Sequence, residues 1–168
     1  MKRDYRELLL RNIWIRITLL LRTIWTFSLD IPAYKEKLAE VSDMYKDKIQ
    51  VRFGIELGLQ MHLGEYFDSL LSQTPFDFVI GSSHLVHGYD PYYPEFFEGR
   101  KEFLCYMEYF ESILENISAY DGFDVYGHID YVVRYGPNKN REYSYGRYKD
   151  ILDEILKKTD FHGKRHRT

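Results

Sequence analysis

Apolar residues recur along the chain with two alternating spacings from residue 30 onward. Helical spacing marks four segments, which are 30–45, 63–72, 103–117 and 144–156. Between them lie three shorter apolar stretches that are typical of strands, 49–57, 76–81 and 123–126. We expect Asp30 and Pro32 to start the first helix, as its N-cap and first-turn proline, and Ser144 to cap the last helix.

This alternation of helices and strands predicts an α/β fold with a parallel sheet or barrel. Right-handed crossovers would bring the carboxyl ends of all the strands to one side. Three predicted strands are too few to close a barrel, and a complete (β/α) barrel takes about 200 residues or more. We therefore expect a part of a larger, TIM-like barrel.

Composition narrows the function only slightly. The chain is 45% apolar and 29% charged, which is ordinary for a soluble globular protein. Its net charge of −3 provides no overall basic field, so the sequence does not support nucleic-acid binding. The single cysteine, Cys105, excludes an internal disulfide and a cysteine-rich zinc site, and we expect it to pack as a small hydrophobic residue.

Residues 8–29 are rich in Leu, Ile and Trp, but Arg11, Arg16 and Arg22 interrupt them. An arginine near the centre of a membrane helix is costly, and no charge-free run here approaches the roughly 20 residues that a span needs. We expect a cationic, amphipathic segment, no membrane span and a cytoplasmic protein. Attachment to a membrane surface is the alternative.

Three strand-like segments each carry a potential metal ligand near their carboxyl end: Glu56 in GIELG, His84 in IGSSH and His128 in YGHIDY. A parallel sheet gathers these ends at one mouth, so we expect the three side chains to face one small volume. One carboxylate and two imidazoles suit Zn²⁺, Mn²⁺ or Fe²⁺. Taken singly, Glu56 could instead pair with a lysine, and either histidine could be a hydrogen-bonded core residue.

The segment after His128 carries two further candidates. We expect Asp130 to share the face of His128 in an extended segment and to orient its imidazole by accepting a hydrogen bond. Arg134 is the candidate contact for a substrate phosphate, because a guanidinium group binds phosphate with two hydrogen bonds. Its alternative is a salt bridge to a carboxylate such as that of Asp130. His62 and His87 are expected in structural or surface positions.

Several ordered motifs resemble the histidinol-phosphatases of the polymerase-and-histidinol-phosphatase (PHP) superfamily. They run from about residue 27 to residue 158 and include FSLDIPAY, KIQVRFGIELGLQ, FDFVIGSSH, DPYYPEFFEGR, YMEYFESI and FDVYGHIDYVVRYG. The resemblance implies a (β/α)₇ barrel with up to three divalent metal ions. It also implies the hydrolysis of L-histidinol phosphate to L-histidinol and phosphate, a step of histidine biosynthesis.

The resemblance assigns roles to four residues. It implies that Glu56 is a bridging carboxylate, that His84 and His128 bind one metal ion, and that Arg134 contacts the substrate phosphate. The small phosphate ester is then the expected partner, and a divalent metal is the expected cofactor.

The family pattern looks truncated or degenerate at both ends, so we expect a partial, distorted barrel with fewer metal ions. Residues 1–26 are a divergent segment in which Arg6 and Leu8 stand where the family has two histidines. Residues 27–158 are the predicted partial domain, and 159–168 are a basic tail expected to be solvated. Two alternatives are a non-catalytic remnant that binds one metal or phosphate, and a phosphoesterase for another small ester.

Overall fold

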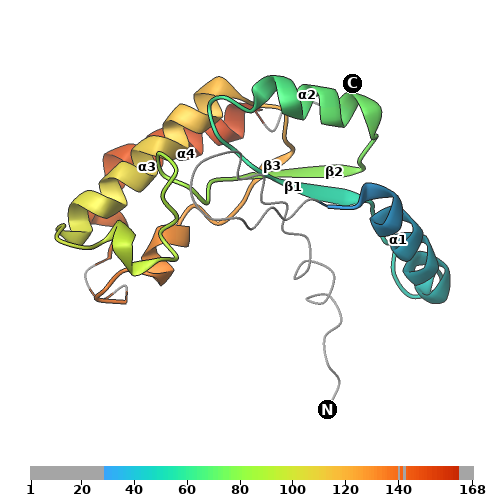
Figure 1. The fold of residues 1–168 in the computed structure, drawn as a ribbon, viewed down its shortest axis with the longest axis horizontal. Helices are drawn as coiled ribbons and strands as arrows, with labels where there is room; N and C mark the ends of the chain where they lie inside the picture. Colours follow the sequence, from blue (N-terminus) through green and yellow to red (C-terminus); the bar gives the residue numbers. More distant parts are fainter. Residues whose placement is uncertain (1–28, 140, 142, 163–168) are drawn as a thin grey trace, which may run out of the picture.

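Helices and strands alternate along the chain in the computed structural model, which describes residues 29–139, 141 and 143–162 (Figure 1). The helices are α1 (Ile31–Tyr45), α2 (Gly64–Gln73), α3 (Glu102–Ala119) and α4 (Lys149–His162). The strands are β1 (Gly54–Gly58), β2 (Phe78–Ser82) and β3 (Val125–Tyr126). Short 3₁₀ helices follow at η2 (Pro94–Phe96), η3 (Tyr131–Arg134) and η4 (Tyr145–Arg147). The predictions for residues 1–26, including those for Arg6 and Leu8, lie outside the described residues.

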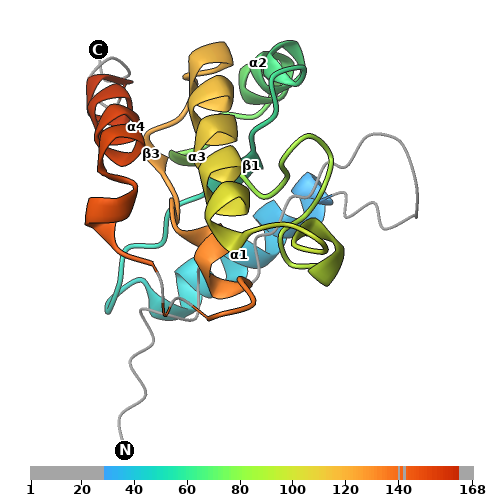
Figure 2. The ribbon, with the colours of Figure 1, turned by 90° about the vertical axis from the view of Figure 1, so that its left-hand side faces the viewer.

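The strands form a parallel sheet in the order β1-β2-β3. Glu56 of β1 pairs with Ile80 of β2, and Ile80 in turn pairs with Val125 of β3. Helices α2, α3 and α4 lie on one face of this sheet, as Figures 1 and 2 show from two directions. The predicted α/β class and the parallel strands are therefore confirmed.

Two strands are shorter than the hydrophobic pattern predicts, because aspartate carboxylates accept hydrogen bonds from backbone N–H groups that a longer strand pair would use. The N–H of Phe53 donates to Oδ2 of Asp77 at 2.8 Å, and the N–H of Val79 donates to Oδ2 of Asp124 at 2.9 Å. The backbone N–H groups of both aspartates donate back, to the carbonyls of Phe53 and Val79. β1 therefore begins at Gly54 instead of residue 49, and β3 keeps two residues.

The core lies between the sheet and the helices that cover one of its faces. Ile55 and Leu57 of β1 are buried there, whereas Glu56, between them in sequence, points to the opposite face. Helix α3 contributes Tyr106 and Tyr109 to this core, and both side chains are fully buried. Among the helices that the structure describes, none has the length and apolar character needed to cross a membrane.

The two outer helices begin differently. Asp30 caps α1 as predicted, since its Oδ1 accepts a hydrogen bond from the N–H of Ala33 at 2.9 Å. Ser144 precedes η4 instead of capping the last helix, and its side chain makes no capping hydrogen bond. Helix α4 starts only at Lys149 and continues to His162, so the first residues of the expected solvated tail are helical.

Candidate metal centre

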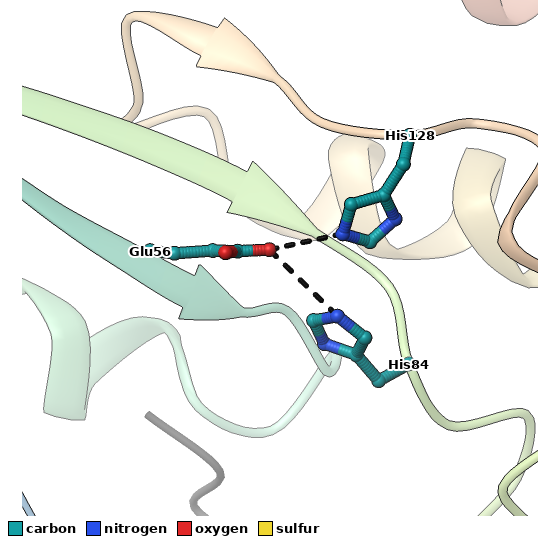
Figure 3. Close-up of side chains that lie close together, drawn as sticks. All are labelled: Glu56, His84 and His128. Carbon is teal, nitrogen blue, oxygen red and sulfur yellow. Dashed lines mark hydrogen bonds and ion pairs between the residues drawn. The ribbon is translucent and has the colours of Figure 1, made fainter. Parts of the chain in front are cut away.

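Glu56, His84 and His128 point toward one another from three neighbouring segments of the sheet (Figure 3). Oε1 of Glu56 lies 3.0 Å from Nε2 of His128 and 3.7 Å from Nε2 of His84. The centroids of the two imidazole rings are 4.9 Å apart. Because their candidate ligand atoms all lie within 4.8 Å of one another, the three side chains share one small volume.

Extension of the sheet beyond its named strands places the two histidines. The N–H of Leu59 donates to the carbonyl of Ser82 at 2.7 Å, and the N–H of Gly127 donates to the carbonyl of Gly81 at 2.8 Å. His84 and His128 each follow two residues after the end of a strand. Glu56 is instead the third of the five residues of β1, so the expectation that it lies near the carboxyl end of its strand is wrong.

His128 is positioned by an abrupt turn of the backbone. Its φ angle is 32°, in the left-handed region, and the carbonyl of His128 accepts a hydrogen bond from the N–H of Tyr131 at 3.0 Å. The neighbouring Gly127 passes close to β2, where an added Cβ would lie 3.1 Å from Cγ2 of Ile80. A larger residue at position 127 would therefore require the Ile80 side chain or the turn to shift.

The same turn places Asp130 differently from the predicted position. The spacing of His128 and Asp130 predicts an extended segment with both side chains on one face. In the structure the backbone turns there, and Asp130 is an exposed residue at the start of η3. The geometric reason for a contact with the His128 ring is therefore wrong, and the role of Asp130 stays a prediction. Arg134 is exposed at the last position of η3, and its phosphate contact also stays a prediction.

Two consecutive serines before His84 face opposite directions. The Ser82 hydroxyl lies 3.4 Å from Nδ1 of His84 and interacts with the Glu56 carboxylate. The Ser83 hydroxyl, fully buried, accepts hydrogen bonds from the Tyr126 hydroxyl at 2.7 Å and from Nδ2 of Asn116 at 2.9 Å. Ser82 therefore supports the candidate ligands, while Ser83 fixes the backbone beside them to β3 and α3.

Local interactions hold Glu56 in its charged form. Burial raises the pKa of its carboxyl group, but hydrogen bonds from His128 and Ser82 and the nearby imidazole charges lower it, and the resulting pKa is below the ordinary value. The side chain of Glu56 is 16% exposed and that of His128 is 21% exposed, so the site is shielded but not fully buried.

The donor set and its spacing fit a divalent metal ion. A tetrahedral site with metal–ligand bonds of about 2.1 Å has ligand–ligand edges of about 3.4 Å. The distances from Oε1 of Glu56 to the two imidazole nitrogens, 3.0 Å and 3.7 Å, lie on either side of that value. Nε2 of His84 is free to bind metal in the tautomer whose Nδ1–H donates to the Ser82 hydroxyl, 3.4 Å away. Three protein ligands of this kind leave positions for water and substrate.

Sequence reasoning missed two residues that contact the candidate ligands, Ser82 and Tyr131. Each lies two or three residues from a candidate histidine, and this short spacing was the available indication. His87 is exposed, as expected for a surface position, whereas His62, expected in a structural position, is exposed as well. His87 has a φ angle of 48° and sits with Gly88 in a tight turn between Val86 and Tyr89, whose backbones pair.

A family model and several known proteins match most of this chain. The profile of the PHP domain matches residues 25–164. A histidinol-phosphatase from Lactococcus lactis subsp. lactis (strain IL1403) is 30% identical over 132 residues, which are 78% of this chain and 49% of that protein. A probable histidinol-phosphatase from Clostridium acetobutylicum is 28% identical over 134 residues, covering 77% of this chain and 52% of the relative.

A solved structure shares the fold. It is the crystal structure of a histidinol phosphate phosphatase from Lactococcus lactis subsp. lactis Il1403, complexed with Zn, L-histidinol and phosphate. The TM-score is 0.76 at 29% identity, over 82% of this chain and 52% of that one. The chain thus spans about half the length of the relatives it matches. These similarities confirm the predicted resemblance and the partial barrel-type α/β fold.

Proposed function

The chain belongs to the PHP domain family, and on that premise we propose that it acts in the metal-dependent hydrolysis of a small phosphate monoester, L-histidinol phosphate. The observation that carries this proposal is the convergence of Glu56, from β1, with His84 and His128, which follow β2 and β3, within 4.8 Å. Relatives named as histidinol-phosphatases, and a similar structure with Zn, L-histidinol and phosphate, support the substrate and the metal.

In this proposal Oε1 of Glu56 and Nε2 of both histidines hold a divalent metal ion, which is Zn²⁺, Mn²⁺ or Fe²⁺. A bound metal of this kind lowers the pKa of water and polarises a phosphoryl oxygen. The protein supplies an ionised Glu56, whose pKa is already lowered, and two imidazoles that need to be neutral to bind the metal. Ser82 contacts both Glu56 and His84, and so it restricts the positions of these two ligands.

Arg134 is proposed to contact the substrate phosphate. It lies in the chain six residues after His128, at the end of η3, and its side chain is exposed. Asp130, at the start of the same 3₁₀ helix, is proposed to orient His128 through its carboxylate. The role of Arg134 rests on the family resemblance, and the role of Asp130 rests only on its closeness to His128 in the chain.

The predicted extent and setting of the enzyme belong to the same proposal. Residues 27–158 would form the functional unit, flanked by 1–26 and 159–168, and the protein would act in the cytoplasm. In the part of the chain that the structure describes, one cluster of three potential ligands is found. We therefore propose fewer metal ions than the three that the family resemblance implies.

Release of inorganic phosphate from L-histidinol phosphate tests the proposed function. The full chain would be stripped with chelator, reloaded with Zn²⁺ or Mn²⁺ and compared with Glu56→Ala and His128→Ala. We expect metal-dependent release that falls at least tenfold in both variants. His87→Ala is the matched control, since it removes an exposed imidazole only three residues from His84, and it should keep the wild-type rate.

Two results would contradict the proposal. Release that persists without metal, or that is equal in Glu56→Ala and wild type, would exclude the site as its source. Faster release from glycerol phosphate than from L-histidinol phosphate would overturn the substrate while leaving the reaction class intact.

A further inference from the structure

One tyrosine side chain contacts both candidate imidazoles. The ring centroid of Tyr131 lies 5.0 Å from that of His84, and the two planes are nearly perpendicular at 87°. The same ring lies 5.5 Å from the His128 ring, at 39°. These separations are in the range in which aromatic rings attract one another. Tyr131 is therefore packed against both imidazole rings, and these rings must be correctly oriented to bind a metal ion.

A buried carboxylate fixes the other end of Tyr131. Its hydroxyl donates to Oδ1 of Asp90 at 3.2 Å, and the N–H of Tyr92 donates to the same oxygen at 2.9 Å. Tyr131 is only 4% exposed and Asp90 only 8% exposed. Burial, followed by the nearby Asp90 charge, raises the pKa of Tyr131, so its hydroxyl keeps the proton that it donates.

This hydrogen bond also joins the two loops that carry the histidines. Asp90 lies in the loop that follows His84, and Tyr131 lies in the turn that follows His128. Movement of either loop would stretch the bond between Tyr131 and Asp90 and displace a ring that touches both imidazoles. The separation between His84 and His128 is thus coupled to this buried hydrogen bond.

We propose that Tyr131, held by Asp90, is a positioning residue that sets the orientation of both the His84 and the His128 imidazoles for metal binding. The proposal rests on the proposed function only in taking these histidines as metal ligands. Groups that orient metal ligands are worth about 10- to 100-fold in metal affinity. Neither Tyr131 nor Asp90 needs to touch the metal or the substrate for this effect.

Titration of the full chain with Zn²⁺ in competition with a chromophoric chelator tests the proposal. We expect Tyr131→Leu, which removes the ring, to weaken Zn²⁺ binding at least tenfold. Tyr131→Phe and Asp90→Asn keep the ring but remove or weaken its tether, and both should weaken binding about threefold. The matched control is Tyr106→Phe, which removes another fully buried hydroxyl beside a carboxylate, that of Glu102, within the aromatic cluster of α3.

A second readout needs no metal. The side-chain order of the two imidazoles, measured by NMR relaxation on ring-labelled histidine in the metal-free chain, should fall in Tyr131→Leu and in Asp90→Asn. It should not change in Tyr106→Phe, even if that variant is less stable. If Tyr131→Leu fails to fold, Tyr131→Phe and Asp90→Asn decide the question by the same two measurements.

The outcomes separate this proposal from the proposed function. Zn²⁺ affinity and ring order that stay at wild-type values in folded Tyr131→Leu, or in both tether variants, would overturn the positioning role. A wild-type chain that binds no Zn²⁺ would overturn the proposed function. Loss of ring order in the variants would then still establish that Tyr131 positions the imidazoles.

Discussion

Replacement of Ser83 by alanine should destabilise the protein far more than its small size suggests. The Ser83 hydroxyl is fully buried and accepts hydrogen bonds from the Tyr126 hydroxyl and the Asn116 amide, at 2.7 Å and 2.9 Å. Alanine would remove this acceptor and leave two buried donors facing a methyl group. A buried polar group that loses its partner costs about 1–3 kcal/mol, so two such groups give about 2–6 kcal/mol.

Urea unfolding monitored by circular dichroism would measure the difference. The matched control is Ser112→Ala on α3, a serine that is also buried but donates only to the carbonyl of Tyr109 within its own helix, at 2.8 Å. Loss of that single bond should change the free energy of unfolding by about 0.5–1.5 kcal/mol. The same m-value in all proteins would show that the comparison concerns stability alone.

A double-mutant cycle sharpens this prediction. Tyr126→Phe removes one of the stranded donors, so it should be less destabilising in the Ser83→Ala background than in the wild type. The reasoning is refuted if Ser83→Ala lowers the free energy of unfolding by no more than Ser112→Ala does. It is also refuted if the effects of Ser83→Ala and Tyr126→Phe simply add.

Three further predictions concern the site and its surroundings. The pKa of Glu56 is lower in the folded protein than the ordinary value of 4.5, so just below pH 4.5 the folded protein binds fewer protons than the unfolded chain. The ionised Glu56 therefore adds to the free energy of unfolding above that pH, and this contribution is lost as the pH falls through the folded pKa. Metal-free Glu56→Gln should therefore lose less stability than wild type in acid titrations followed by fluorescence, and equal slopes would contradict this. Gly81→Ala should destabilise by about 1–3 kcal/mol in thermal unfolding, because its Cβ would lie 2.8 Å from the buried Phe123 ring; an unchanged melting temperature would refute the overlap. Cys105 is fully buried and burial raises the pKa of its thiol, so it should react with a disulfide reagent only after unfolding, and rapid labelling of the native protein would contradict this.

The sequence pattern predicted the elements better than their limits. Helical and strand spacing depends on which side chains face the core, and this was readable for α1, α3 and β2. The start of β1 could not be predicted from the sequence pattern. The side chain of Asp77, which is distant in sequence, accepts a hydrogen bond from the N–H of Phe53, and the backbone ladder ends there. Such a competition between a side chain and a strand depends on tertiary contacts.

The candidate site shows the same division. Parallel topology explains why His84 and His128 meet, since both follow the carboxyl ends of parallel strands, but it does not explain how Glu56 reaches them from the middle of β1. It does not explain the left-handed conformation of His128, which turned Asp130 out of the predicted extended segment. It also could not identify Tyr131, whose contact with His84 joins loops that are distant in sequence.

The number of Zn²⁺ ions bound by the full chain tests the central claim most directly. Isothermal titration of metal-free protein should give about one ion per chain, with binding lost in Glu56→Ala and His128→Ala. Binding should be retained in His62→Ala and His87→Ala, which remove exposed imidazoles. Zn²⁺ binding of the same stoichiometry and affinity in all five proteins, or none in the wild type, would contradict a metal centre at this edge of the sheet.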